Sequence, residues 1–124
     1  MDRTCVRGVR GAINVLENEA EEIYRATMEL LEAMVAENGI DTEDIASILF
    51  TVTTDLNADF PAHAARDLGW QYVPLICATE ISVPGSMPRV IRVLMHVNTC
   101  KSQKEIKHVY LRDAARLRKD LLPQ

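Results

Sequence analysis

Arginine is the residue type in this chain best suited to specific chemistry. Ten of the fourteen basic residues are arginine. The planar guanidinium binds a carboxylate or phosphate through two parallel hydrogen bonds, which an ammonium group does not reproduce. Arg10 lies between Gly8 and Gly11, and Arg92 lies in the middle of an apolar run. The pattern favours a local site for a small anion. The alternative is that each arginine pairs with a neighbouring acid on a solvated surface.

Most other chemistries lack their motifs. The chain contains neither Gly-x-Gly-x-x-Gly nor Gly-x-x-x-x-Gly-Lys-Ser/Thr, so it is not expected to bind a nucleotide cofactor. Its three cysteines form no Cys-x-x-Cys pair and its three histidines are irregularly spaced, so we predict reduced thiols, no metal and no cofactor. A lone cysteine in an apolar segment, such as Cys77, is ordinarily a small buried residue.

Length and composition limit the class of protein. A chain of 124 residues with 48% hydrophobic residues predicts one folded domain over residues 1–124. The formal net charge of −4 argues against nucleic-acid binding, which requires many phosphates to be neutralised. No apolar run is long enough for a membrane span, and the N-terminal residues lack the apolar stretch of a secretory signal. We therefore expect a cytoplasmic protein with no membrane partner.

The first half of the chain predicts strand, helix, strand and helix. Residues 5–13 form a strand interrupted by glycines. A long helix begins at Asn18, with Glu21 completing a capping box, and ends at Gly39. Residues 45–53 are an apolar run of strand length. Asp59 is expected to cap a short helix that continues to about Gly69, with Pro61 in its first turn.

The second half predicts three strands and one more short helix. Residues 70–78 read as a strand, which Pro74 places at a sheet edge or at a bulge, and residues 83–86 read as a type II turn. Residues 89–97 alternate cleanly, with one apolar face and one face that carries Arg92. Ser102 and Glu105 predict a capping box, residues 108–111 a last strand, and residues 112–124 a C-terminal tail that starts with a basic run.

We therefore predict an α/β (α+β) fold, in which one mixed β-sheet of about five strands carries one long helix and two short helices. A single long helix covers only one face of such a sheet. The other face is expected to be buried against copies of the same chain in a symmetric oligomer.

Five segments resemble one known family in the same order along the chain. They are Arg-Gly-Val-Arg-Gly-Ala at 7–12, Thr-Asp-Leu-Asn-Ala-Asp-Phe-Pro-Ala at 54–62, Gly-Trp-Gln-Tyr-Val-Pro at 69–74, Ile-Arg-Val-Leu-Met at 91–95 and His-Val-Tyr-Leu at 108–111. They are similar to the monofunctional, homotrimeric chorismate mutases of the α/β pseudo-barrel class. The resemblance implies a homotrimer that forms a pseudo-α/β barrel, with active sites between subunits and neither metal nor cofactor.

The reaction that this resemblance implies is the Claisen rearrangement of chorismate to prephenate, in the phenylalanine and tyrosine branch of aromatic amino-acid biosynthesis. Chorismate is a dicarboxylate whose enolpyruvyl arm folds over the ring, and an ether C–O bond lengthens in the transition state. An enzyme therefore binds two anions and neutralises the charge that develops on the ether oxygen. Restraint of the folded conformer and a donor at that oxygen both lower the barrier.

The resemblance also assigns roles to individual residues. Arg92 meets the ether oxygen, Arg10 binds a carboxylate, and Glu80 accepts a hydrogen bond from the ring hydroxyl. The remaining substrate-binding residues are Tyr110, which closes over the ligand; Cys77, near the hydroxyl; Phe60, Ala62, His63 and Arg66, on the wall from the adjacent subunit; and Arg118, which covers the site from the tail.

Three features of the sequence leave alternatives to this assignment. Cys77 and Glu80 are three residues apart, so a regular strand places them on opposite faces. His63 stands where the family commonly has lysine, and Arg116 competes with Arg118 for the role in the tail. A second hypothesis on the same scaffold is a non-catalytic trimeric domain that binds or senses a small anion, because fold alone does not decide function.

Overall fold

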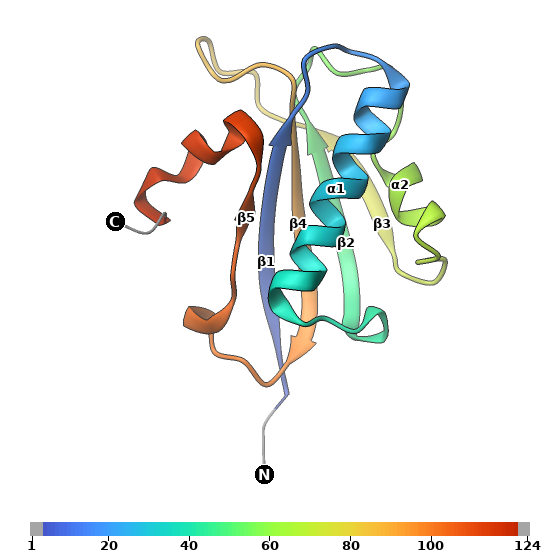
Figure 1. Cartoon of the computed structure of the whole chain (residues 1–124), viewed down its shortest axis with the longest axis vertical. Coiled ribbons are helices and arrows are strands. Elements are labelled where there is room, and N and C mark those ends of the chain that lie inside the picture. The colour runs from blue at the N-terminus through green and yellow to red at the C-terminus, as the bar shows by residue number, and fades with distance from the viewer. Residues whose placement is uncertain (1–3, 122–124) are drawn as a thin grey trace.

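The computed structural model describes residues 4–121, with side chains up to Leu117. It contains one five-stranded mixed sheet with the strand order β3-β2-β4-β1-β5 (Figure 1). In chain order the elements are β1 (Cys5–Asn14), α1 (Ala20–Asn38), η1 (Thr42–Asp44), β2 (Ile45–Val52), α2 (Ala62–Asp67), β3 (Leu75–Thr79), β4 (Val90–Thr99), η2 (Gln103–Glu105), β5 (Val109–Tyr110) and η3 (Arg112–Leu121). The predicted fold class is confirmed.

The central strand is β4, which pairs antiparallel with β1 on one side and with β2 on the other. The outer strands pair in parallel, β3 with β2 and β5 with β1. Helix α2 makes the crossover from β2 to β3, the connection that a parallel pair requires. Arg92 lies opposite Ala12 of β1 and Thr51 of β2, so the sheet holds this arginine between two other strands.

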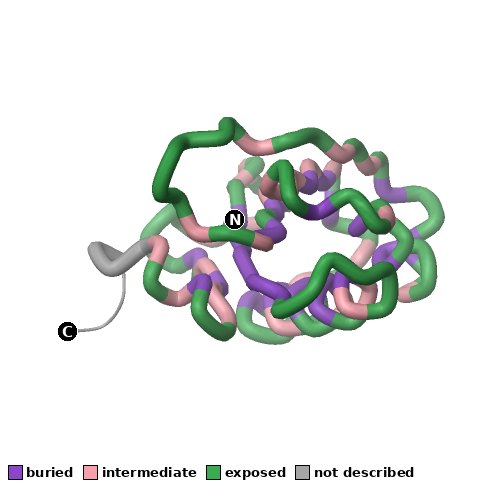
Figure 2. The backbone as a smooth tube through the Cα atoms, turned by 90° about the horizontal axis from the view of Figure 1, so that it is seen from above, coloured by how far each residue is buried: buried purple, intermediate pink, exposed green. Residues whose placement is uncertain are grey.

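Helix α1 packs lengthwise on one face of the sheet (Figure 1). Five of its apolar residues recur at helical spacing and are fully buried, namely Ile23, Ala26, Leu30, Leu31 and Met34. Gly39 ends the helix in the left-handed conformation at φ 58°. Gly11 allows the close approach, because a Cβ at that position would lie 2.4 Å from Met34 Sδ. Figure 2 shows buried stretches toward the middle of the molecule and exposed ones around its edge.

Both predicted N-caps of the first half are wrong. Glu19 is the N-cap of α1 and makes no side-chain capping bond. Asn18 instead bonds the 57–58 loop, where its Oδ1 accepts from the backbone N–H groups of Asn57 and Ala58 at 3.1 Å each. Pro61 is the N-cap of α2. Tertiary contacts compete for these polar side chains, which the local sequence does not reveal.

Two predicted strands are shorter than expected. The segment from Trp70 to Pro74 forms turns, and the parallel pairing begins where Ile48 N–H donates to Pro74 O at 2.9 Å. The side chain of Trp70 is nevertheless buried in the core, which explains the apolar pattern. Strand β5 has only two residues because His108 bonds β1 through its imidazole, with Arg10 N–H donating to His108 Nδ1 at 2.9 Å.

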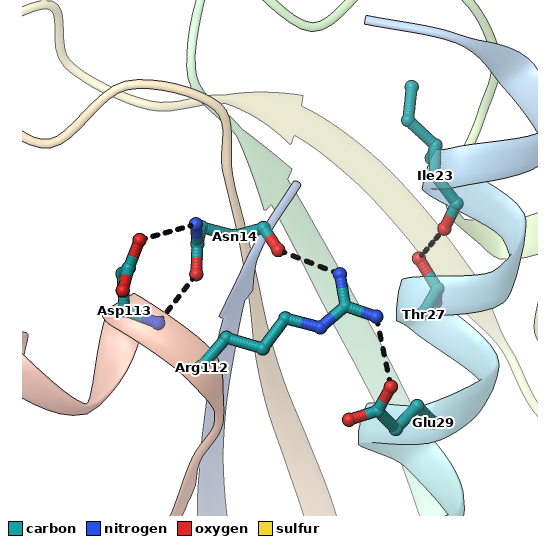
Figure 3. A network of polar contacts seen from close by, with 6 residues as sticks. All are labelled: Asn14, Ile23, Thr27, Glu29, Arg112 and Asp113. Carbon is teal, nitrogen blue, oxygen red and sulfur yellow. Dashed lines mark hydrogen bonds and ion pairs between the residues drawn. The ribbon is translucent and has the colours of Figure 1, made fainter. Parts of the chain in front are cut away.

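The beginning of the C-terminal segment is tied to the end of β1 (Figure 3). Asp113 N–H donates to Asn14 Oδ1 at 2.8 Å, and Asn14 Nδ2 donates to Asp113 Oδ2 at 3.3 Å. Arg112, at φ 56°, donates to Asn14 O and to Glu29 Oε1. The sequence predicted a tail here, and the structure has the 3-10 helix η3 over Arg112–Leu121.

The sheet face opposite the helices is open over much of its area. Arg10, Leu94, Leu49 and Ile76 lie side by side across four strands on this face. Ile76 of the edge strand β3 is 65% exposed, which is unusual for a large apolar residue on a sheet. This open face is where we predict contacts between copies of the chain.

Candidate active site

A cavity of about 200 Å³ lies on the open face, across β1, β4 and β2. Four of the predicted site residues, from four separate segments, line it together: Arg10, Glu80, Arg92 and Tyr110. The other lining residues, which the sequence analysis did not assign, are Gly11, Ala12, Leu49, Thr51, Val93 and Leu94. The site therefore combines an apolar floor with a few charged groups, as ligand sites commonly do.

Arg92 and Glu80 form a loose ion pair. Arg92 Nε lies 3.6 Å from Glu80 Oε1, which is within ion-pair range but too long for a hydrogen bond. The side chain of Arg92 is 45% exposed and that of Glu80 is 29% exposed. A guanidinium carries five N–H donors, so this pairing leaves Arg92 with donors for an anion in the cavity.

Glu80 follows directly after β3, and two bonds fix it to β2. Its backbone N–H donates to Val52 O at 2.8 Å, which extends the β2–β3 pairing by one residue. Its Oε1 accepts a hydrogen bond from Thr51 Oγ1 at 2.7 Å. The strand end thus positions the carboxylate beside β4, where Arg92 is located.

Arg10 supplies a second cation on the same face as Arg92. It is exposed, and its neighbour Gly11 faces α1 on the other side of the sheet. Burial lowers the pKa of His108. This favours the neutral imidazole that accepts from Arg10 N–H. Two arginines and one carboxylate leave the cavity with one net positive charge, which suits an anionic ligand.

Five other predicted binding residues lie on or beside α2, away from this cavity: Phe60, Ala62, His63, Arg66 and Cys77. Cys77 and Phe60 line a second hollow of about 360 Å³. Cys77 lies opposite Phe50 on the helix-covered side of the sheet, and burial raises the pKa of its thiol. Within one protomer Cys77 and Glu80 line separate cavities, so their predicted shared pocket stays a prediction.

Most of the predicted binding residues on α2 and just before it are exposed. Phe60 is 64% exposed and makes an edge contact with the His63 ring. His63 Nδ1 lies 2.9 Å from Asp59 Oδ1, and its hydrogen bond to Asp59 lowers the pKa of that carboxyl. Arg66 Nη1 donates to Gln71 O at 3.2 Å, while Ala62 is half-buried at the start of α2.

Arg116 and Arg118, the two candidates for covering the site, both lie in η3. Arg116 Nη2 lies 3.1 Å from Asp113 Oδ1 in an exposed pair. The side chain of Arg118 lies outside the described residues, so its predicted role stays a prediction. Within the part of the chain that the structure describes, no cluster of three His, Cys, Asp or Glu residues could hold a metal ion.

Sequence reasoning missed Thr51 and the two leucines of the cavity floor. A run of apolar residues from Ile45 to Val52 gives no sign of which side faces a ligand. The register supplies that information, because Leu49 pairs with Leu94 and Thr51 with Arg92. Alternation along β4 would have identified Leu94, since it shares the face of Arg92.

The fold and the site define an α+β domain whose open sheet face carries a cavity lined by two arginines and one glutamate, a composition suited to a small anion. The chain belongs to the chorismate mutase type I family, whose model matches residues 6–121. It is 56% identical over 117 residues to the chorismate mutase AroH of Thermus thermophilus, covering 94% of this chain and 96% of that protein. It is 46% identical over 117 residues to the chorismate mutase AroH of Bacillus subtilis (strain 168), covering 94% and 92%.

A solved structure agrees with these sequence matches. The chorismate mutase from Clostridium thermocellum, Cth-682, superimposes with a TM-score of 0.88 at 53% identity, covering 89% of this chain and 98% of that one. The predicted family and enzyme class are confirmed: the protein is a chorismate mutase. The alternative of a non-catalytic anion-binding domain gains no support. Among the described residues, no helix is long and apolar enough to cross a membrane.

Proposed function

We propose that the protein converts chorismate to prephenate in the cavity formed by Arg10, Glu80, Arg92 and Tyr110. In this single concerted step, the ether C–O bond to the ring breaks while a C–C bond forms between the enolpyruvyl methylene and the ring. No atom leaves and no electron acceptor is needed, so the reaction requires no cofactor. The enzyme acts only by restraining the substrate and by stabilising charge.

Arg92 is the residue that we assign to the developing charge. The ether oxygen becomes partly anionic as its bond lengthens, and a donor fixed at that point stabilises the transition state more than the ground state. The observation that carries the proposal is the loose pair with Glu80, whose 3.6 Å separation leaves guanidinium donors for the ligand. One such donor contributes about 3–4 kcal/mol, or roughly 10²–10³ in kcat.

Arg10, Tyr110 and Glu80 hold the folded substrate around that point. Arg10 binds a carboxylate, and Tyr110 closes over the same end of the ligand. Glu80 accepts a hydrogen bond from the ring hydroxyl and balances the positive end of the breaking system. These three residues line one cavity with Arg92, which supports the assignment.

The remaining wall of the site comes from a neighbouring subunit in a homotrimer whose sheets form a pseudo-barrel. We assign to this wall the second group of residues, namely Phe60, Ala62, His63, Arg66 and Cys77. Support comes from the open sheet face and from the exposure of Phe60 and Ile76, since apolar surface of this kind marks contact sites. The segment 112–124 is proposed to move over the ligand and to bring Arg118 to it. The enzyme is proposed to be cytoplasmic.

The direct test is to mix purified protein with chorismate and to follow the loss of its diene absorbance. Arg92→Lys retains the charge but not the planar fork, so we expect kcat to fall at least 100-fold. Arg25→Lys is the matched control, because Arg25 forms only an exposed pair with Glu21 on α1 and should keep normal turnover. Unchanged chorismate with the wild-type enzyme contradicts the activity, and near-normal kcat in Arg92→Lys contradicts the role of Arg92.

A shared site can be tested by complementation. Arg92→Ala and Arg66→Ala inactivate opposite walls of the proposed site. If each site uses two chains, co-expression of the two variants restores a fraction of the activity, because some hybrid trimers contain an intact site. Sedimentation then gives the oligomeric state. A monomer, or no recovery in hybrids of confirmed mixed composition, contradicts this part of the proposal.

A further inference from the structure

Thr51 is the one aliphatic hydroxyl side chain among the described residues that line the cavity, which also includes the phenol of Tyr110. It lies on β2, directly opposite Arg92 of β4 and Ala78 of β3. Its Oγ1 donates to Glu80 Oε1 at 2.7 Å, a short and therefore strong bond to a carboxylate. Thr51 thus contacts the carboxylate and is the cross-strand neighbour of the arginine.

One carboxylate oxygen of Glu80 lies close to both Thr51 and Arg92. Glu80 Oε1 accepts from Thr51 and lies 3.6 Å from Arg92 Nε. A carboxylate and a guanidinium at that separation ordinarily close to less than 3 Å and form a two-point pair. The bond from Thr51, together with the bond from Glu80 N–H to Val52 O, holds the carboxylate on β2 and opposes that closure.

We propose that Thr51 is a positioning residue that keeps Glu80 from closing onto Arg92. A closed pair would occupy the Arg92 donors that the ether oxygen needs and the Glu80 oxygen that the ring hydroxyl needs. Thr51 therefore acts on the transition state through Glu80 and Arg92, without itself touching the reacting atoms. The inference rests on the proposed roles of these two residues.

The test compares two substitutions of similar size. Thr51→Val removes the donor but keeps the shape and the β-branched side chain, whereas Thr51→Ser keeps the donor. Hydrogen bonds to charged groups correspond to roughly 10–100-fold in an equilibrium, so we expect kcat to fall at least 10-fold in Thr51→Val with a smaller change in KM. Thr51→Ser should retain at least about half of kcat. Thr99→Val, on the same sheet but outside the cavity, is the matched control.

Two further readouts separate positioning from a merely structural role. In a Glu80→Ala background, Thr51→Val should change kcat less than about twofold, because its effect passes through the carboxylate. A crystal structure of Thr51→Val should show the Arg92–Glu80 distance shortened to hydrogen-bond length.

Several results would overturn the inference: normal kcat in Thr51→Val, equal losses with and without Glu80, or an unchanged distance of 3.6 Å between Arg92 Nε and Glu80 Oε1. A failure of the proposed function would give a different result, since the wild-type enzyme itself would then leave chorismate unchanged. If wild type is active and Glu80→Ala is impaired while Thr51→Val is normal, only the role of Thr51 is lost.

Discussion

Gly11→Ala should destabilise the protein through a single methyl group. Gly11 lies on β1 beneath α1, and its added Cβ would lie 2.4 Å from Met34 Sδ and 3.1 Å from Leu30 Cδ1. Ordinary contacts at this position are 3.4–4 Å. Met34 is fully buried, so its side chain has no solvent to move into. Either Met34 repacks within the core or α1 moves away from β1.

The magnitude follows from these distances. Overpacking of this kind costs about 1–3 kcal/mol, and replacing a strand glycine with alanine returns up to about 1 kcal/mol. We therefore expect a net loss of about 1–2 kcal/mol in the free energy of unfolding, or roughly 4–8 °C in Tm for a domain of this size. Arg10 and Ala12 flank Gly11 and line the cavity, so kcat/KM should fall as well.

The assay is urea unfolding at one fixed protein concentration, since association shifts apparent stability. Gly8→Ala is the matched control, because its Cβ meets only Leu94 Cδ1 at 3.4 Å, and we expect it to change stability by less than about 1 kcal/mol. In a Met34→Ala background, the added methyl group should cost much less, because only the 3.1 Å contact with Leu30 Cδ1 remains. An equal cost of Gly11→Ala with Met34 and with Ala at position 34 would refute the proposed clash.

Two further predictions concern His108, which bonds the backbone of Arg10, and Asp55, which bonds the backbone of Arg89. Burial lowers the pKa of His108 below its usual 6.5. Below pH 6.5 the unfolded chain therefore binds a proton at His108 that the folded protein does not yet bind. The free energy of unfolding falls as the pH drops from 6.5 toward the pKa of the folded protein. His108→Asn keeps an acceptor for Arg10 N–H without titrating, so urea unfolding between pH 5 and 7 should depend less on pH; an identical dependence would contradict this reasoning. Asp55 accepts both bonds from the N–H of Arg89, which has a φ of 53°. Asp55→Ala should therefore lose about 1–2 kcal/mol, and Asp55→Asn less; equal losses would rule out an acceptor role.

The sequence predicted best the features that depend on residue spacing within a single helix or strand. The spacing of Ile23, Leu30 and Met34 predicts the buried side of α1, and alternation along β4 predicts that Arg92 faces away from the helices. Both expectations depend on local periodicity alone, and the structure confirms both. Gly39 is a similar case, because a left-handed helix end needs no information from elsewhere in the chain.

What the sequence did not predict depends on contacts between distant segments. Asn18 has the right residue type and spacing for a cap, yet it bonds the loop at Asn57, which only the tertiary fold brings near. Trp70 has the apolarity of a strand residue but fills the core from a turn. Thr51 could be placed in the site only once the register of β2 against β4 was known.

The geometry of the site is a consequence of how the other face of the sheet packs. Side chains on a strand alternate between faces, so several cavity residues on the strands have a direct neighbour in the core or against α1. These pairs are Arg10 with Gly11, Thr51 with Phe50, Arg92 with Ile91 and Val93, and Tyr110 with Val109. A change of core volume that shifts one strand relative to its neighbour therefore moves a charged group by a similar distance. Since electrostatic stabilisation of a developing charge depends on a fixed donor position, core substitutions under β1, β2 and β4 should lower kcat before they unfold the protein.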